Sequence, residues 1–544
     1  MNLYPYDRYQ DCMADLLERE IDAAPDDSVL QLSQPVYYLK RRVRVHHKKN
    51  LTLDGNGCRI VTAFNNHAGF SDSVDALYFQ NCKGLLLKNF SIDTDVPANT
   101  TAVVESISGD ASSFILKIDP EYHIHGDEFL LALNTVDEDG SPDYRLQHYA
   151  LHPDRSIVAL LAGEIILANT YWDLPETAKK YLGNHRFEVT LKPGDASRMF
   201  PGERVCIRHT MYGPVSMLFK HCDDTVISDV TLYGAPGMGI IVLPRCHNFT
   251  LDGFKVLPRP DTDQLMAANC DGVHITGVTG KIVLRNCIFD GLGDDALNLH
   301  STAATVTGIN QNTLQVHYCK KRPDGVLSAD WCRPGDRIRI YDDERCTQTG
   351  AFTVVSYQGD EMEITDLTGE LSCGRVLQNT AFAPDLTVEN CTIRNTRARG
   401  LIIQTDRAEI ANNTFFGMSY SGVKAAPAMK YWYEVGPANG LSIHDNVFRK
   451  CCCHVVTGPE NPVVGVMRTH DNPADRDDYD ILHHNIRICD NLFEDIHGRL
   501  ITVAAADMVL ISGNRAVHCS NPQNHPLCSV NSCKNVILEP IEEI

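Results

Sequence analysis

Residues 269–300 decide the fold, and they read NCDGVHITGVTGKIVLRNCIFDGLGDDALNLH. Asp271 lies 23 residues before Asp294 and 24 residues before Asp295. A repeat in the twenties made of short strands and turns is typical of a solenoid in which each repeat forms one coil. Residues one repeat apart then stack on neighbouring coils, separated by the inter-strand spacing of about 5 Å. The three carboxylates are therefore expected to form one cluster.

The same short-strand pattern recurs along most of the chain. Apolar residues alternate along each copy and an Asn or Asp stands at the turn, as in LTLDGNGCRIV and KIVLRNCIFDG. Asn390 and Asn413 lie 23 residues apart, as do Asn491 and Asn514. Alternation indicates strands, and Asn and Asp tolerate the left-handed turn conformation between them. The predicted fold is an all-β parallel β-helix, since propeller blades need roughly 40 residues each.

Two stretches interrupt the repeat, residues 101–209 and 302–384, and their strand patterns lack its period. Each opens with a hairpin pattern and contains a later strand that begins PGER or PGDR, which indicates two inserted antiparallel β-barrels. The expected order is a cap and first coils in 1–100, a first barrel in 101–209, acid-bearing coils in 210–301, a second barrel in 302–384 and C-terminal coils in 385–544. Helical spacing over residues 9–23 predicts a helix that caps the open end of the solenoid.

The charge of the chain narrows the classes of ligand. The formal net charge of the 544 residues is −21 at pH 7. Nucleic acid needs a basic surface and is not an expected partner. An anionic polymer is an awkward substrate unless basic groups gather in the site, so a neutral ligand fits better. With 43% hydrophobic and 22% charged residues, the chain can bury a continuous core.

The sequence shows no pattern of a secretory signal or a membrane span. The amino terminus, MNLYPYDRYQDCMADLLERE, carries acids throughout and lacks an apolar core. The chain is therefore expected to be cytoplasmic, without a membrane partner. Most of its 20 cysteines sit beside the Asn or Asp of a repeat, where reduced thiols act as small hydrophobes in the coil interior. The adjacent Cys451, Cys452 and Cys453 lack a second pair at metal-ligand spacing, so zinc is not expected.

Clustered carboxylates on the face of a β-helix suit inverting glycoside hydrolysis. One protonated carboxyl assists the leaving oxygen while an ionised one activates water, with ~6.5–9.5 Å between them. Crowded acids raise one another's pKa, which keeps one of them protonated near neutral pH. The alternatives are an Asp ladder that only satisfies the coil turns, and a calcium site.

The register of the coils brings further polar residues to the acids. Aligning apolar residues sets 272–275 over 296–299 and places Asp271 beside Asp295. On this register one face carries His274, Asn298 and Lys424, and two residues later Thr276, His300 and Gln404. A column of hydrogen-bond donors beside three acids indicates a sugar site. His and Lys are not ligands that calcium selects, so neither a metal nor a cofactor is expected.

At these residues the chain resembles glycoside hydrolase family 110, the exo-acting, inverting α-1,3-galactosidases that cleave terminal galactose from blood-group-B-type and linear Galα1,3Gal structures. The resemblance rests on RHTMYG at 208–213, on GAPGMG at 234–239, and on Asp271, Asp294, Asp295, Asn298 and His300. It covers most of the chain and implies a right-handed parallel β-helix that carries two β-barrel insertions. It also implies an oligosaccharide with terminal α-galactose as the substrate.

The resemblance implies a role for each acid. Asp294 corresponds to the general acid, and Asp271 and Asp295 to the residues that hold and activate the water. Arg208 of the first motif either contacts sugar hydroxyls or pairs with an acid where the chain re-enters the helix. Trp432, in an aromatic loop between coils, either stacks on a pyranose face or belongs to a buried hydrophobic lid. The candidate substrate-binding residues are Arg208, Tyr212, His274, Asn298, His300, Gln404, Lys424 and Trp432.

Two other functions stay open. Polygalacturonases use a similar three-Asp arrangement on this fold, so a pectin-type glycosidase is one alternative. A lyase on the same fold would want calcium and a basic residue, for which the sequence offers Lys424 and Arg399 without a clear cluster. A noncatalytic carbohydrate-binding solenoid is the other alternative, but it has no reason to place three acids at coil spacing. The sequence also leaves open the aglycone and whether the chain forms a homodimer.

Overall fold

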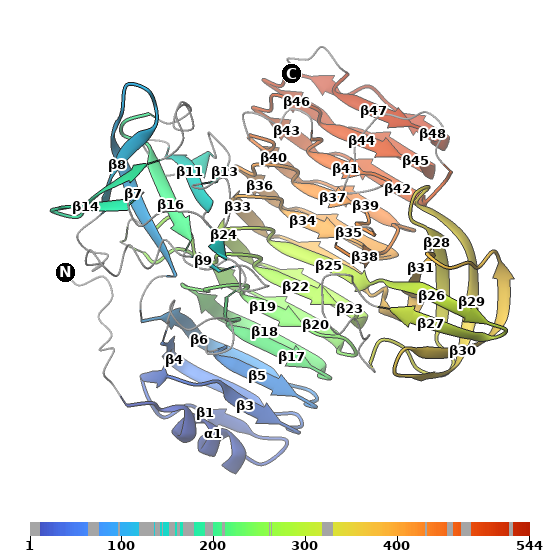
Figure 1. Ribbon diagram of the computed structural model, residues 1–544, viewed down its shortest axis with the longest axis horizontal. Coiled ribbons are helices and arrows are strands. Elements are labelled where there is room, and N and C mark those ends of the chain that lie inside the picture. Colours follow the sequence, from blue (N-terminus) through green and yellow to red (C-terminus); the bar gives the residue numbers. More distant parts are fainter. Residues whose placement is uncertain are drawn as a thin grey trace.

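The computed structural model describes residues 11–544 apart from 64–74, 96–97, 119–134, 137–141, 144, 152–157, 160–163, 167–178, 191–199, 209–212, 261, 263, 318–329, 430–431, 454–460, 469–479 and 522–525. Among the described residues, the regular structure is β-strand apart from the helix α1 (Ala14–Ala23) and a single 3₁₀ turn at Thr380–Phe382. The strands stack in parallel coils along one axis (Figure 1). The predicted parallel β-helix is confirmed.

Each coil contributes strands to two long sheets. One coil runs through β22 (Val273–Thr276), β23 (Thr279–Arg285) and β24 (Ile288–Leu292), and a turn then leads into β25 (Leu297–Thr302). The 12-stranded sheet contains β3 (Val43–His46), β5 (Leu77–Gln80), β17 (Met217–Lys220), β19 (Ile240–Val242), β22, β25, β34 (Leu401–Ile403), β37 (Val423–Ala425), β41 (Val464–Val466), β44 (Ile501–Ala504) and β47 (Cys528–Asn531), with β38 (Glu434–Val435) paired antiparallel to β25.

The 21-stranded sheet forms the rest of each coil. It contains β1 (Val29–Gln31), β2 (Val36–Leu39), β4 (Thr52–Thr62), β6 (Leu86–Thr94), β18 (Asp223–Leu232), β20 (His247–Asp252), β21 (Lys255–Val256), β23, β24, β32 (Asp385–Glu389), β33 (Thr392–Thr396), β35 (Arg407–Ala411), β36 (Thr414–Phe416), β39 (Leu441–His444), β40 (Val447–Arg449), β42 (His483–Cys489), β43 (Leu492–Glu494), β45 (Ala506–Ser512), β46 (Arg515–Val517), β48 (Lys534–Leu538) and β49 (Glu542–Glu543). Asn286, between β23 and β24, has a φ of 57°, the left-handed turn conformation expected of Asn at this place.

The coil register at the acids is the predicted one, because His274 pairs with Asn298 and Leu297 with Leu401. The register differs between β32 and β35, where Glu389 pairs with Ala411, an interval of 22 residues. The residue that matches Asn390 is therefore Asn412, and both have left-handed φ values of 55° and 58°. The sequence interval of 23 to Asn413 joined residues with different roles, because Asn413 points into the core.

The first insertion consists of antiparallel strands. One eight-stranded sheet contains β7 (Asn99–Ile107), β8 (Ser113–Ile118), β11 (Arg145–Leu151), β12 (Val158–Ala159), β13 (Glu164–Ile166), β14 (Lys179–Gly183), β15 (Arg186–Thr190) and β16 (Arg204–Arg208). A separate two-stranded sheet pairs β9 (Thr135–Val136) with β10 (Pro142–Asp143). Whether this sheet closes into a barrel through residues outside the described set stays a prediction.

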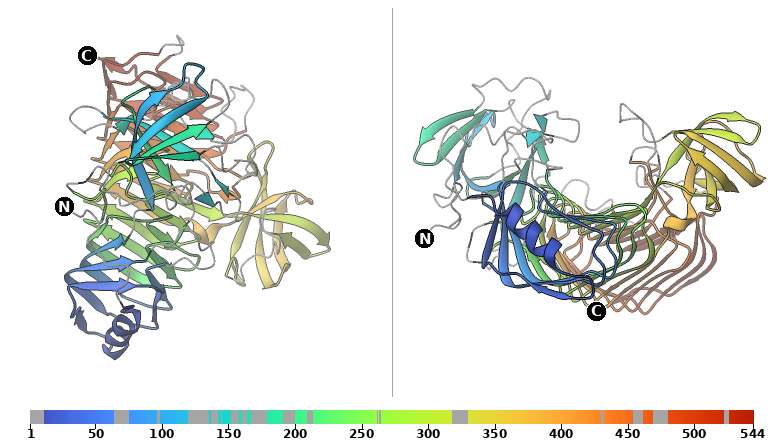
Figure 2. Two further views of the ribbon diagram at one scale, coloured as in Figure 1. Left: turned by 60° about the vertical axis from the view of Figure 1, so that its left-hand side comes forward. Right: turned by 90° about the horizontal axis from the view of Figure 1, so that it is seen from below.

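The second insertion is a closed barrel of β26 (Ala304–Asn310), β27 (Thr313–His317), β30 (Glu361–Gly369), β29 (Thr347–Gln358), β28 (Arg337–Asp342) and β31 (Val376–Asn379). Trp331 Nε1 donates to the carbonyl of Thr302, which ties the barrel to the end of β25 (2.9 Å). In the right-hand view of Figure 2 the two insertions rise from opposite sides of the solenoid toward the same face.

The core fills the interior of the coils. Phe415, Phe448 and Phe493 stack one above another with ring centroids 4.7 and 5.2 Å apart. Cys287 and Cys391 are buried in the same cluster, which confirms the predicted place of these thiols. Stacking identical residues lets each coil bury its apolar face against the next, which a single coil cannot do alone.

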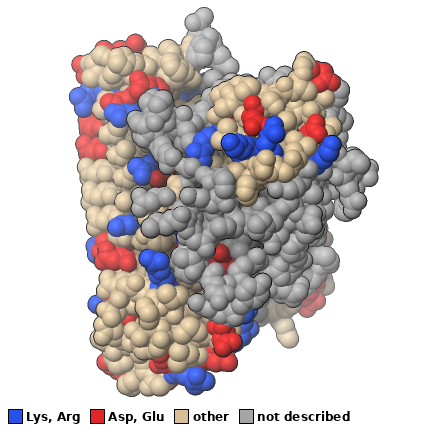
Figure 3. Space-filling view, turned by 90° about the vertical axis from the view of Figure 1, so that its left-hand side faces the viewer, with Lys and Arg blue, Asp and Glu red and all other residues tan. Residues whose placement is uncertain are grey.

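The helix α1 covers the amino-terminal end of the solenoid with Leu17 and Ile21, both 1% exposed, in the main core. It begins at Ala14, later than the predicted residue 9, and residues 1–10 lie outside the described set. No described helix is long and apolar enough to cross a membrane. On the described part of the face in Figure 3, basic side chains lie among acidic ones.

Candidate active site

The three predicted acids lie on two stacked turns that lead into the 12-stranded sheet. Asp271 precedes β22, and Asp294 and Asp295 precede β25. The Gly272 N–H donates to the carbonyl of Asp295 (2.9 Å), so the turns are hydrogen-bonded to each other. They also approach closely, since a Cβ on Gly293 would lie 2.1 Å from the carbonyl oxygen of the stacked turn. The expected cluster of carboxylates is therefore built by backbone stacking.

Asp271 is the acid held by histidine. Asp271 is 3% exposed, and its Oδ2 lies 2.8 Å from Nδ1 of His274. Its Oδ1 accepts a hydrogen bond from the backbone N–H of Asp295 (3.2 Å). Burial raises the pKa of Asp271, the contact with His274 opposes the rise, and the charge of Asp294 adds to it. The carboxyl is thus fixed in place and has a strengthened affinity for a proton.

Asp295 is the acid held by arginine. Its Oδ1 accepts hydrogen bonds from the backbone N–H and the Nε of Arg399 (2.9 and 2.8 Å), and its Oδ2 accepts one from a terminal nitrogen (3.0 Å). Burial raises the pKa of Asp295 to about 7, although the Arg399 guanidinium lowers it and the charge of Asp294 raises it further. The same ion pair raises the pKa of Arg399, which stays charged.

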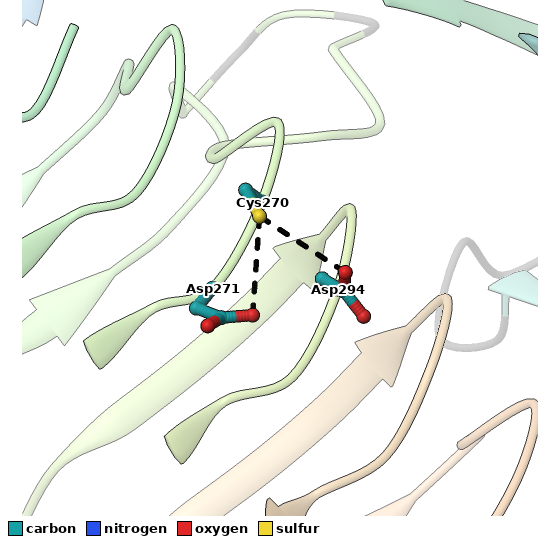
Figure 4. A group of neighbouring side chains, drawn as sticks. All are labelled: Cys270, Asp271 and Asp294. Atoms are coloured by element: carbon teal, nitrogen blue, oxygen red, sulfur yellow. Dashed lines mark hydrogen bonds between the residues drawn. The ribbon is translucent and has the colours of Figure 1, made fainter. Parts of the chain in front are cut away.

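Asp294 is the most open of the three acids, with 18% of its side chain exposed. Two guanidinium groups lie near its Oδ1, those of Arg399 at 3.6 Å and Arg397 at 3.8 Å. These distances are longer than hydrogen bonds, and Oδ1, a buried atom, has no hydrogen-bond partner among the described residues. The thiol of Cys270 stands between Asp271 and Asp294, 3.9 and 4.0 Å from their carboxylate oxygens (Figure 4).

The atoms drawn in Figure 4 also have the spacing of metal ligands. One ligand atom each from Cys270, Asp271 and Asp294 lies within 4.8 Å of the others. Two arginine cations adjoin this group, and positive charges oppose the binding of another cation. A thiol is in addition a poor ligand for calcium or magnesium. These residues do not fit a hard cation, and the absence of a metal stays a prediction.

The predicted polar residues form a second group beside the acids. His274 Nε2 lies 3.1 Å from Nε2 of His300, and the two rings meet edge to face. Asn298 and Gln404 each donate from their side-chain amide to Glu434, at 3.2 and 2.8 Å. His300 Nε2 lies 3.8 Å from the same carboxylate. A chain of contacts therefore runs from Asp271 through two histidines to a fourth acid, Glu434, which is buried.

The remaining predicted residues lie at different places. Lys424 is 6% exposed and pairs with Ile402. Ile402 in turn pairs with Asn298, so Lys424 lies two coils beyond Asn298 in the same column. Trp432 is 47% exposed, which disfavours the buried-lid interpretation of this side chain. Arg208 ends β16, but its side chain lies outside the described set, and so does the whole of Tyr212. Their predicted contacts with sugar stay predictions.

Sequence reasoning missed two residues that hold this site together. The sequence predicts Arg399 only as a basic residue that a lyase could use, yet Gly400 follows it just as Gly272 follows Asp271 and Ala296 follows Asp295, which puts Arg399 in the column of these two acids. That register was the signal for the ion pair. Glu434 follows a long connection between coils, where no period applies, and its place was not predictable in this way.

No family model matches the chain. It is 24% identical over 499 residues to Alpha-1,3-galactosidase B of Bacteroides thetaiotaomicron, a match that spans 90% of this chain and 78% of that protein. It is also 24% identical over 514 residues to Alpha-1,3-galactosidase A of Bacteroides fragilis, spanning 91% and 79%. These relatives confirm the resemblance carried by the sequence motifs.

Among solved structures, a family 28 exopolygalacturonase from Yersinia enterocolitica superposes with a TM-score of 0.42 and 11% identity, covering 99% of this chain and 77% of that one.

Proposed function

We propose that this protein is an exo-acting, inverting glycoside hydrolase that removes terminal α-linked galactose, with a preference for the α-1,3 linkage. The observation that carries the proposal is the cluster of three carboxylates on stacked turns, each with different partners. His274 holds Asp271 and Arg399 holds Asp295, whereas one oxygen of Asp294 accepts no hydrogen bond from the residues that the structure describes. One acid is therefore available for proton donation while two are fixed.

Asp294 is the general acid in this proposal. Its side chain is more exposed than those of Asp271 and Asp295, at 18% against 5% and 3%. A general acid has to come within hydrogen-bond distance of the leaving oxygen, which a fully buried carboxyl cannot do. Its partners at 3.6 and 3.8 Å leave room for the carboxyl to turn toward a substrate.

Asp271 and Asp295 hold and activate the attacking water. A general base is most effective when its pKa lies near the working pH. Burial raises the pKa of both carboxyls, to about 7 in the case of Asp295. Their hydrogen bonds to His274 and Arg399 fix the direction from which a water molecule can be bound. Both carboxylates then face one water, and displacement occurs with inversion.

The choice of galactose rests on the relatives. Two proteins named alpha-1,3-galactosidase match about nine tenths of this chain, at 90% and 91% coverage. The polar groups beside the acids suit a sugar with several free hydroxyls, because amides, histidines and carboxylates hydrogen-bond to hydroxyls in both directions.

The stereochemistry of the product tests the mechanism. Proton NMR of an α-galactoside during hydrolysis is expected to show β-galactose first, with the α-anomer appearing only by mutarotation. Initial α-galactose would overturn the roles given to the three acids. A panel of nitrophenyl and natural α- and β-galactosides tests the substrate, and hydrolysis of α-1,3-linked galactose faster than the other linkages is the expected result.

A second candidate is a glycosidase that acts on uronides, as polygalacturonases do. Arg397 and Arg399 next to Asp294 favour it, because a uronate carboxylate needs basic partners. Arg399, however, already gives three hydrogen bonds to Asp295. Glu434 and its amide partners Asn298 and Gln404 lie beyond the histidine pair. These residues decide between a neutral and an acidic sugar.

A further inference from the structure

Glu434 belongs to a loop that is fastened to the coil carrying the acids. Its backbone N–H and carbonyl both hydrogen-bond with Ala428, at 3.3 and 3.0 Å. As part of β38 it pairs with Thr302 at the end of β25. Trp432, two residues earlier and 47% exposed, donates its backbone N–H to the same Ala428 carbonyl (3.2 Å). The loop therefore holds an acid and an exposed aromatic ring in one fixed arrangement.

Two amides support the Glu434 carboxylate from the 12-stranded sheet. Asn298 donates to Oε1 and Gln404 to Oε2, so each carboxylate oxygen has one amide partner. Both amides are oriented by this contact, since an amide oxygen turned toward a carboxylate would be repelled. Gln404, predicted as a contact to substrate, is 1% exposed and acts here as a support for Glu434.

This support has a cost to stability. The side-chain oxygens of Asn298 and Gln404 are buried and have no hydrogen-bond partner within the part of the chain that the structure describes. Buried polar atoms without partners are rare in folded proteins, because each one forgoes the hydrogen bonds it made to water. An arrangement kept at such a cost is typical of a functional site, and its result is a carboxylate held in a defined place.

Glu434 has unused hydrogen-bonding capacity. An ionised carboxylate offers about four lone-pair sites and can donate no hydrogen bond. The two amides occupy two of these sites, and 12% of the Glu434 side chain is exposed. Sugar hydroxyls are donors that match the remaining sites, whereas the carboxylate of a uronate offers only acceptors.

The charges around the site point the same way. Asp271, Asp294, Asp295 and Glu434 bring four carboxyl groups together, connected by the contacts of His274 and His300. Arg397 and Arg399 lie within 4 Å of Asp294, and the guanidinium of Arg399 is bonded to Asp295. An acidic sugar would place a second carboxylate against Glu434, whose neighbours are the amides of Asn298 and Gln404 and the ring of His300, and like charges at close range oppose binding.

We propose that Glu434 is a specificity-determining residue that accepts hydrogen bonds from sugar hydroxyls and makes the site select a neutral sugar over its uronic acid counterpart. The inference rests on the proposed function, since it takes the three-acid cluster to be a glycosidase site. Asn298 and Gln404 are positioning residues for Glu434.

Calorimetry with the full chain tests the proposal without requiring turnover. The ligands are D-galactose and D-galacturonate, which differ by a carboxylate at one carbon. The wild-type protein is expected to bind galactose and to bind galacturonate far more weakly. In Glu434→Gln, galactose affinity should fall roughly 10–100-fold, the size of a hydrogen bond to a charged group, and the preference over galacturonate should collapse.

Two further variants control for folding and charge. Glu434→Asp keeps the negative charge but shortens the side chain, so it should weaken galactose binding and still exclude galacturonate. Glu409→Gln removes a carboxylate that pairs with His444 on the outer surface, and it should leave both affinities unchanged. Melting curves of each variant show whether an altered affinity reflects loss of the fold.

The possible results separate the two proposals. Unchanged galactose affinity and preference in Glu434→Gln would overturn the role of Glu434. So would a wild-type protein that binds galacturonate as tightly as galactose, or that binds no galactose. If Glu434→Gln changes both affinities as expected while the wild type hydrolyses no α-galactoside, the proposed function fails and the selection of a neutral sugar by Glu434 stands.

Discussion

Two regions of the solenoid repeat a polar side chain at the coil interval, and they use it in opposite ways. In the C-terminal coils the repeated residues are Asn413, Asn446, Asn491 and Asn514, all buried at 0–2% exposure. The side-chain N–H groups of Asn413, Asn446 and Asn491 each donate to the side-chain oxygen of the next Asn in the column at 3.0 Å. In the acid-bearing turns the repeated residues are carboxylates, which offer only acceptors and repel one another.

The difference separates a structural ladder from a functional cluster. An amide is both donor and acceptor, so each Asn of the column can bond to the next Asn as well as to backbone groups of its own coil and the preceding one. A column of Asp cannot, and Asp271 and Asp295 take their donors from His274 and Arg399. A ladder of Asp that serves only the turns would not leave Asp294 with an oxygen that no described residue hydrogen-bonds. A repeated residue that can hydrogen-bond to its own copies indicates a stabilising role. A repeated residue whose copies repel one another indicates a catalytic role.

The largest expected effect comes from removing the general acid. Asp294→Asn keeps the shape of the side chain but cannot donate the proton, so kcat should fall by about 10²–10⁴-fold with the melting temperature nearly unchanged. Asp224→Asn, at the start of β18 where the carboxylate accepts a hydrogen bond from Asn248, is the matched control and should keep full activity. Wild-type activity in a folded Asp294→Asn protein would contradict the assignment.

Breaking the Asn ladder should give the reverse pattern. The side-chain amide of Asn446 donates to the carbonyls of Ile410 and His444 and to the side-chain oxygen of Asn491. Its side-chain oxygen accepts a hydrogen bond from the amide of Asn413. Asn446→Ala leaves several buried groups without partners, so the free energy of unfolding should fall by about 2–4 kcal/mol. Urea unfolding measures this loss, and kcat per folded molecule should be unchanged. A large loss of kcat in the folded fraction would mean that the ladder and the site are not separate.

The same comparison shows how far the sequence could be used. Within uninterrupted coils the repeat interval and the apolar pattern predict the register, because a slip by one residue would turn the apolar side chains away from the core. The register in turn predicts the cluster of the three acids. The pairing of Arg399 with Asp295 joins residues 104 positions apart, across the second insertion. The length of an insertion carries no information about the register at which the coil resumes, so only the alignment of small residues before the strands could recover this partner.

Glu434 marks the limit of that reasoning. It reaches Asn298 from a loop 136 positions later in the chain, and it is placed by antiparallel pairing with the end of β25. Nothing in the coil repeat describes an antiparallel strand. The shift to an interval of 22 between β32 and β35 has a similar cause, since a turn can lose a residue without disturbing the strands beside it.

A smaller effect is expected from weakening the support of Asp295. Arg399→Lys keeps a positive charge but loses the planar, bidentate contact, and kcat/KM should fall by roughly 10–100-fold. The pH profile carries the diagnostic signal. In the wild type, kcat/KM should fall as pH drops below about 7, because the raised pKa of Asp295 leaves the base protonated there. The apparent value belongs to the coupled acids as a group.

The direction of the shift follows from the sign of the ion pair. Arg399 lowers the pKa of Asp295 against the effect of burial, so replacing it should move the acidic limb of the profile to higher pH. The contribution of Asp295 to the free energy of unfolding changes with pH in the opposite direction to that of an acid whose pKa a salt bridge lowers. Because the pKa of Asp295 is higher in the folded state, its contribution to stability is present below its ordinary value of 3.8 and is lost as pH rises toward 7. A profile that moves to lower pH would contradict Asp295 as a base.

The smallest expected effect is that of a chelator, and it tests whether the acids act through protons alone. Cys270, Asp271 and Asp294 have ligand atoms within 4.8 Å of one another, so a metal role for the cluster is a specific alternative to the one proposed. Two guanidinium groups within 4 Å of Asp294 already supply the positive charge that a cation would bring, at 3.6 and 3.8 Å. Dialysis against EDTA should therefore leave kcat/KM unchanged, with a calcium-dependent hydrolase treated in parallel to show that the chelator works. Loss of activity that added calcium restores would instead favour a lyase, and would mean that repelling acids in this solenoid are held together by a metal in place of Arg397 and Arg399.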